Sequence, residues 1–187
     1  MIICHRFPIV IMSSPRTGST VLAKYLHNLY PSLDLFTEPY QEHQQYFLEY
    51  TKTKSDYILK FHPGMSEYPL ELFSNATLIK LRRKNLVEQF ASFYVLMIRG
   101  LDSYDKIEDS ELEKFANTEV PIDTNMMKKA IIWQQQYNDA LNNINLNFDY
   151  DLYYEDLPKL TESKITPKPL NYQIIKDYMQ TLIEQQT

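Results

Sequence analysis

Apolar residues along the chain alternate between short unbroken runs and longer stretches with helical spacing. The short runs are rich in β-branched and aromatic residues and predict five strands, at residues 7–13, 33–39, 55–63, 75–83 and 148–157. Apolar residues at helical spacing predict helices from about 20 to Pro31, at 40–51, near 68–74, at 85–100, at 122–145 and from about 171 onward. Strands that alternate with helices indicate a parallel sheet joined by right-handed crossovers.

The longest predicted helix carries one apolar stripe, and we expect the tryptophan on that stripe to lie in the core. The stripe consists of Ala130, Trp133, Tyr137, Leu141 and Ile144. Residues 101–120 are charged and weakly patterned; we interpret them as a surface helix, with a mobile lid as the alternative. We find no repeat and no second domain in the sequence, so residues 1–187 are predicted to form a single domain.

Composition narrows the class of protein. With 44% hydrophobic and 23% charged residues, the 187-residue chain has the makeup of one globular domain, and its net charge of −5 argues against a nucleic-acid-binding surface. One cysteine, Cys4, excludes an internal disulfide and a cysteine-rich zinc site, and it fits a reducing, cytoplasmic location. The apolar N-terminal stretch is too short for a membrane span and lacks a cleavage pattern, so we assign it to the first strand.

The clearest candidate for chemistry is the segment SSPRTGSTVL, residues 13–22, at the junction of a buried strand and a helix. Gly18 allows the backbone to come close to a ligand, and the N–H groups of the helix start favour an anion. Arg16 adds a fixed positive charge, and Ser19 and Thr20 add hydroxyl groups. The plainer interpretation is a turn in which Ser19 or Thr20 simply caps the helix.

This loop differs from that of ATPases and kinases, GxxxxGK[ST], because Ser19 stands where their lysine would be. The six residues Pro15, Arg16, Thr17, Gly18, Ser19 and Thr20 instead resemble the 5′-phosphosulfate loop of sulfotransferases. Members of that family use 3′-phosphoadenosine-5′-phosphosulfate (PAPS) as sulfuryl donor and release 3′-phosphoadenosine-5′-phosphate (PAP).

A second segment, LIKLRRKNLVEQFAS at 78–92, is again a strand end followed by a helix. An arginine at the strand end and a helical serine can meet one phosphate from two sides. The segment resembles the 3′-phosphate site of sulfotransferases, in the longer register of the trehalose sulfotransferase branch. Arg83 with Ser92 is the preferred pair, and Arg82 is the second choice for the arginine. The alternative is a strand end whose basic residues are exposed to solvent and bind no phosphate.

Two further stretches offer a base. Glu38 in FTEPY is similar in position to the catalytic carboxylate of the trehalose and tyrosylprotein branches, and His62 in LKFHP resembles the histidine base of cytosolic sulfotransferases. Taken alone, a glutamate is more often exposed to solvent, and a histidine at a strand end is more often a packing residue. We choose Glu38 and leave His62 as the alternative.

The stretch LYYEDL at 152–157 resembles the end of the last sulfotransferase strand and is interpreted as structural. One departure is the absence of the R-K-G-x-x-G loop that covers the 3′-phosphate in cytosolic members; Lys164 or Lys168 could replace it.

Taken together, the resemblance implies an α/β, three-layer, P-loop-like fold with a parallel sheet of about five strands. It also implies PAPS as co-substrate, no metal, Arg16 at the leaving phosphate, and a small-molecule, carbohydrate or peptide acceptor. The alternatives are a P-loop nucleotide or small-molecule kinase and a non-catalytic nucleotide-binding module.

Overall fold

The computed structural model describes residues 4, 6–39, 42–101, 109–158 and 168–185. The predicted fold class is confirmed: the chain is an α/β protein with a central sheet of five parallel strands flanked by helices. The strands are β1 (Ile9–Ser13), β2 (Asp34–Thr37), β3 (Tyr57–Phe61), β4 (Thr77–Arg82) and β5 (Tyr150–Tyr153). Their order across the sheet is β2-β3-β1-β4-β5, so β1 lies at the centre.

The helices follow the predicted positions closely. They are α1 (Ser19–Leu29), α2 (Glu42–Thr51), α3 (Leu86–Ile98), α4 (Asp109–Ala116), α5 (Thr124–Asn142) and α6 (Tyr172–Glu184), with short 3₁₀ helices η1 (Leu70–Phe73) and η2 (Tyr154–Asp156). The surface helix expected within 101–120 is α4, although residues 102–108 lie outside the described part of the chain.

Contacts divide the chain into two compact units, residues 1–84 with 136–162 and residues 85–135 with 163–187. The division falls within α5. The prediction of a single domain over residues 1–187 stays a prediction.

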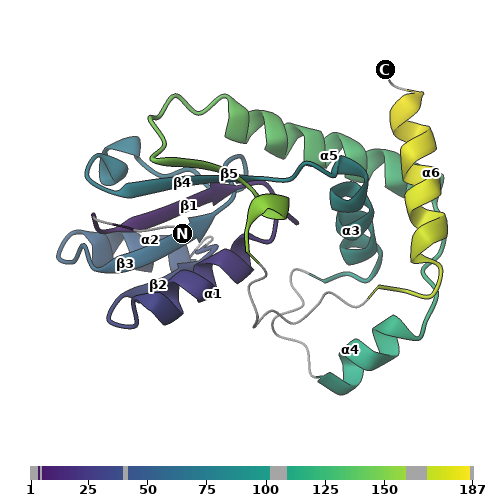
Figure 1. Cartoon of the computed structure of the whole chain (residues 1–187), viewed down its shortest axis with the longest axis horizontal. Coiled ribbons are helices and arrows are strands. Elements are labelled where there is room, and N and C mark those ends of the chain that lie inside the picture. Colours follow the sequence, from purple (N-terminus) through teal and green to yellow (C-terminus); the bar gives the residue numbers. More distant parts are fainter. Residues whose placement is uncertain (1–3, 5, 40–41, 102–108, 159–167, 186–187) are drawn as a thin grey trace. The chain divides into compact units, whose positions relative to one another are not determined.

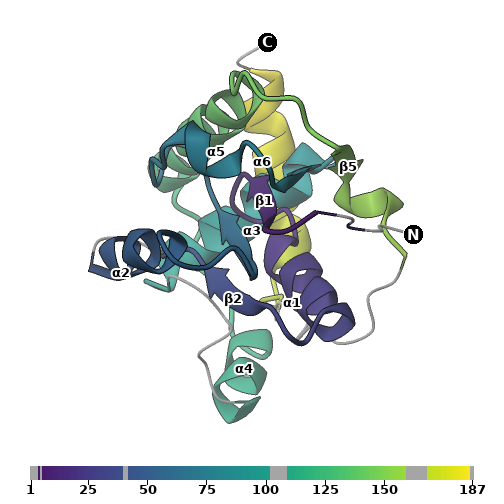
Figure 2. The ribbon, with the colours of Figure 1, turned by 90° about the vertical axis from the view of Figure 1, so that its left-hand side faces the viewer.

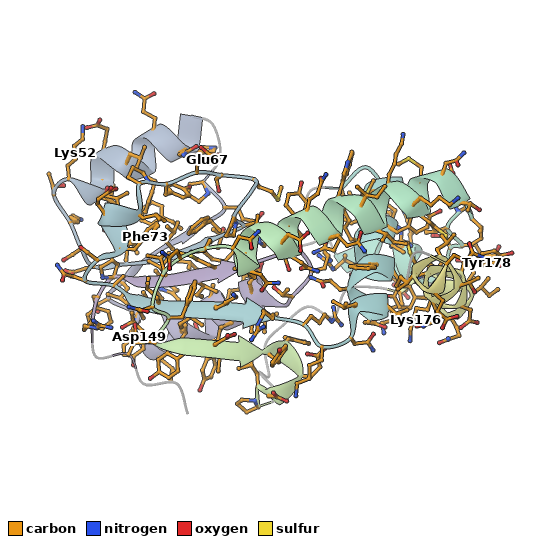
Figure 3. The ribbon with its side chains drawn as sticks, turned by 90° about the horizontal axis from the view of Figure 1, so that it is seen from above. Lys52, Glu67, Phe73, Asp149, Lys176 and Tyr178 are labelled. Atoms are coloured by element: carbon orange, nitrogen blue, oxygen red, sulfur yellow. The ribbon has the colours of Figure 1, made fainter. Side chains whose placement is uncertain are left out.

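In the first unit, the sheet is covered on both faces, and Figure 2 shows α1 and α2 on opposite sides of it. One face packs against α1 through Ile9, Ile11, Ile58, Ile79, Leu22 and Leu26. The other face packs against α2 and the end of α5, with Phe73 lying between α2 and the strands in Figure 3. Because side chains alternate between the faces of a strand, a residue two positions beyond Ile11 or Ile58 points to the α1 side.

The second unit is built around α3 and α6. The Asn171 side chain accepts from the Val120 amide at 3.0 Å and donates to the Val120 carbonyl at 2.7 Å, which fixes the start of α6. Glu88 on α3 pairs with Lys176 on α6 at 3.4 Å.

The predicted apolar stripe of the longest helix is partly wrong. Ala130 and Leu141 are buried, but Trp133 is 45% exposed, whereas Met127 and Ile131 are fully buried. Each residue turns the helix by about 100°, so the buried face passes through Met127, Ala130 and Ile131, and Trp133 falls beside it.

Candidate functional site

The loop between β1 and α1 bends the chain back through two residues in the left-handed region. Gly18 has φ 79° and directly precedes α1, where its carbonyl accepts from Val21 N at 3.1 Å and Leu22 N at 3.2 Å. Arg16 also has a positive φ, 62°. A glycine cap has no side chain to accept from the first-turn N–H groups, so these groups are suited to an anion. The cap is therefore Gly18, not Ser19 or Thr20.

The hydroxyl groups of the loop divide into inner and outer ones. Thr17 is fully buried and donates through Oγ1 to the Ser14 carbonyl at 2.9 Å, which holds the bend, and Ser19 is buried at the start of α1. Arg16 and Thr20 are half-buried. Thr17 thus shapes the loop, whereas Arg16 and Thr20 can reach solvent and a ligand.

The ring of Tyr154, in η2, lies directly against Gly18. A Cβ atom placed on Gly18 would be 2.3 Å from Tyr154 Cδ2 and Cε2. Glycine is therefore required here both by the backbone angle and by the space that the ring fills. The Tyr-Glu-Asp-Leu stretch, interpreted from the sequence as structural, packs against the loop through Tyr154.

Arg83 connects β4 to this loop. Its Nη1 donates to the Arg16 carbonyl at 2.9 Å, its guanidinium lies 5.5 Å from the Tyr154 ring centre, and its Nε is 3.7 Å from Glu155 Oε1. The side chain is 16% exposed. A nearly buried guanidinium at a loop shaped for anions is well placed to contribute charge to it.

The neighbouring Arg82 points elsewhere. It makes a bidentate pair with Asp151, at 2.9 and 2.8 Å, and its guanidinium lies 4.6 Å from the Tyr153 ring centre. Successive residues at a strand end point to opposite faces, so of the two arginines the structure brings only Arg83 to the loop. Ser92, its predicted partner, is buried on α3 in the second unit.

A second group of side chains gathers where β2 and β3 end. Glu38 has φ 49°, and its amide donates to the Lys60 carbonyl at 2.7 Å, extending the pairing of β2 with β3. Its carboxylate forms an ion pair with Lys60, whose side chain is only 2% exposed, and Glu38 Oε1 lies 2.8 Å from His62 Nε2. Lys60 Nζ is 3.2 Å from the same His62 nitrogen. The two bases offered by the sequence are therefore in direct contact.

The other ring nitrogen of His62 is fixed by β1. His62 Nδ1 lies 2.7 Å from the Ser13 carbonyl oxygen and 3.2 Å from Ser13 Oγ. A carbonyl oxygen only accepts, so Nδ1 carries a hydrogen, and in the neutral ring Nε2 is the lone-pair nitrogen facing Glu38 and Lys60. Burial above all, and then the charges of Lys60 and Arg16, hold the pKa of His62 well below 6.5, against the opposing effect of the Ser13 carbonyl.

These groups follow the order of the strands. In parallel strands all carboxyl ends lie at one edge of the sheet, and there the chain presents Glu38 after β2, His62 after β3, the Arg16 loop after β1 and Arg83 after β4. Ligands in open α/β sheets bind at this edge, where the strand order reverses. The arrangement places the glycine-capped loop and the Glu38–Lys60–His62 group at one edge of the sheet.

Ser13 and Tyr154 were not predicted as site residues, and Lys60 was noted from sequence only as the neighbour of His62 in LKFHP. Lys60 carried a signal, since a lysine two positions before His62 in an apolar strand shares its face. The role of the Ser13 carbonyl and the contact of Tyr154 with Gly18 depend on tertiary packing.

The prediction that Lys164 or Lys168 covers the 3′-phosphate stays a prediction. Lys168 Nζ pairs with Glu88 Oε1 at 2.8 Å within the second unit, and Lys164 lies outside the described residues. Among the described residues, no three histidine, cysteine, aspartate or glutamate side chains converge as a metal site would require. No helix in the described ranges has both the length and the apolar character needed to cross a membrane.

Compared with known proteins, the chain matches no family model and no curated protein.

Proposed function

We propose that the protein is a PAPS-dependent sulfotransferase, which moves a sulfuryl group to a hydroxyl or amine of an acceptor. The observation that carries the proposal is the position of the Glu38–Lys60–His62 group beside the glycine-capped loop at the same sheet edge. Sulfuryl transfer needs these two parts together, because a base must face the acceptor while fixed positive charge meets the leaving phosphate.

In this proposal, the acceptor oxygen or nitrogen attacks sulfur, and the bond from sulfur to the bridging oxygen of the 5′-phosphate breaks. The electron pair of that bond stays on PAP, where Arg16 and the N–H groups at the start of α1 stabilise it. Arg83, whose Nη1 donates to the Arg16 carbonyl, contributes positive charge for the 3′-phosphate. The acceptor proton goes to the group at the end of β2 and β3. By its chemistry, the acceptor belongs to the small molecules, carbohydrates or peptides that carry a nucleophilic hydroxyl or amine.

A P-loop kinase is the main alternative, and the charge at the end of β3 argues against it. Such enzymes hold Mg²⁺ with a hydroxyl of the loop and a strand-end aspartate, and they clamp phosphate with the loop lysine. Here Ser19 replaces that lysine, and β3, one of the two strands beside β1, carries Lys60 near its end and is followed by His62. At this place the carboxylate of Glu38 is already paired with the buried Lys60, which argues against its holding Mg²⁺.

The test is a thermal-shift comparison of PAP, AMP and ATP with Mg²⁺ at equal concentrations, since a ligand that binds only the folded state stabilises it by mass action. We expect PAP to raise the Tm most and AMP much less. PAP release from PAPS, measured with carbohydrate, phenol and peptide acceptors, then tests catalysis. A larger shift from ATP with Mg²⁺ than from PAP would overturn the proposal in favour of the kinase.

A further inference from the structure

Glu38 and His62 present two proton acceptors to one another. The Ser13 carbonyl takes the Nδ1 hydrogen of His62, so in the neutral ring Nε2 faces Glu38 Oε1 with its lone pair, at 2.8 Å. That distance is a hydrogen-bond length, and without a proton between them the two lone pairs repel. Lys60, paired with Glu38 and 3.2 Å from Nε2, offsets part of this repulsion and holds the two atoms together.

We propose that Glu38 and His62 act as one acid–base dyad, which takes the acceptor proton into the contact between Glu38 Oε1 and His62 Nε2. The proposal rests on sulfuryl transfer as the reaction, and it replaces the choice between two separate bases with a shared role. Lys60 is then a positioning residue, since it acts on the proton through the dyad.

The proton balance follows from the charges. Before transfer, Glu38 is a carboxylate, His62 is neutral and Lys60 is an ammonium group, so the three side chains sum to zero. As the acceptor attacks sulfur and the bond to the 5′-phosphate breaks, the acceptor proton enters the dyad and the sum becomes +1. The dyad later releases the proton to water, and the overall reaction yields the sulfated acceptor, PAP and one proton.

The groups around His62 keep the dyad from binding the extra proton before the reaction. The charged groups that face His62 are Glu38 after β2, Lys60 on β3 and Arg16 in the β1–α1 loop. Burial and the two cations lower the pKa of His62 well below 6.5, so the ring is neutral near pH 7. Two coupled sites of this kind titrate with midpoints that belong to the pair.

The first test uses the ligand-free full chain and needs no donor. NMR with ¹⁵N-histidine and ¹³C-glutamate labels follows His62 Nε2 and the Glu38 carboxyl carbon with pH, assigned through His62→Asn and Glu38→Gln. We expect both nuclei to move together below pH 6.5, and the His62 midpoint to fall further in Glu38→Gln, because the carboxylate favours the charged ring. Glu49→Gln, which removes an exposed carboxylate on α2, is the matched control and should leave it unchanged. Separate midpoints, or an unaltered His62 in Glu38→Gln, would overturn the dyad.

The second test is kinetic and uses PAPS consumption with water as acceptor, or with the best acceptor found. Single Glu38→Gln and His62→Asn variants should each lose about 10²- to 10⁴-fold, as is typical of general-base catalysis. The double variant should lose no more than the worse single variant, because residues that act as a unit are not additive. Multiplicative losses would overturn the dyad. If PAP fails to bind while the NMR midpoints coincide, sulfuryl transfer is wrong and the dyad stands.

Discussion

Replacing Gly18 by alanine tests the close contact between the loop and η2. Alanine destabilises the folded state in two ways. A non-glycine residue in the left-handed region costs about 1–2 kcal/mol, and the new Cβ would lie 2.3 Å from atoms of the Tyr154 ring. Overpacking of this kind costs about 1–3 kcal/mol. We therefore expect Gly18→Ala to lower the free energy of unfolding by about 2–5 kcal/mol, as measured by urea denaturation.

The chain provides a matched control for each cost. Gly100 has φ 63°, and no atom of the described residues lies within 4 Å of its Cβ position, so Gly100→Ala should show the backbone cost alone. In a double-mutant cycle, Tyr154→Ala should remove the overlap and recover about 1–3 kcal/mol as coupling energy. If Gly18→Ala costs no more than Gly100→Ala, and Tyr154→Ala does not change that cost, the ring does not lie against Gly18 and the reasoning fails.

Three further outcomes follow from the site. In calorimetric titrations, Arg83→Ala should weaken PAP binding by about 10- to 150-fold, the loss of one charge-assisted pair, and should affect AMP binding much less. Arg82→Ala should change the affinity for neither nucleotide. The reverse result would assign the 3′-phosphate to Arg82 instead of Arg83. Arg16→Ala should lower turnover at saturating PAPS far more than PAP affinity, because the charge it meets grows during transfer; an unchanged turnover would make it an anchor. The pKa of His62 is lower in the folded than in the unfolded chain, so below pH 6.5 the unfolded chain binds more protons. The free energy of unfolding should therefore fall on acidification by up to about 1.4 kcal/mol per pH unit. Urea unfolding between pH 5 and 8 should show a weaker dependence of that free energy on pH in His62→Asn.

The fold could be predicted from the sequence because the strands and the helices each have a recognisable local pattern of apolar residues. Buried parallel strands appear as short apolar runs, so the strand around Ile11 and the one around Leu59 were found within two residues of their ends. The stripe of α5 was misjudged at Trp133, because an amphipathic pattern fixes the buried face only to within about one residue's rotation.

The site was accessible in part. The glycine in the loop and the charged residues at the strand ends indicate where a site could lie, but they do not show which side chains touch. The sequence therefore offered Glu38 and His62 as alternative bases and did not show that they are in contact. Their contact depends on the alignment of β2 with β3, in which Thr37 lies opposite Lys60. Sequence alone gives no such alignment, because it is fixed when the two strands pack.

The pair between Arg82 and Asp151 stabilises the alignment of β5 with β4. A slip of one residue along a strand turns every side chain to the other face, and in β5 it would turn Tyr153 away from Arg82. β5 is a four-residue strand at the edge of the sheet, where a slip meets least resistance, and the bidentate pair ties it to β4 in one alignment. The Arg82–Asp151 pair therefore holds the edge of the sheet, apart from the loop that Arg83 contacts.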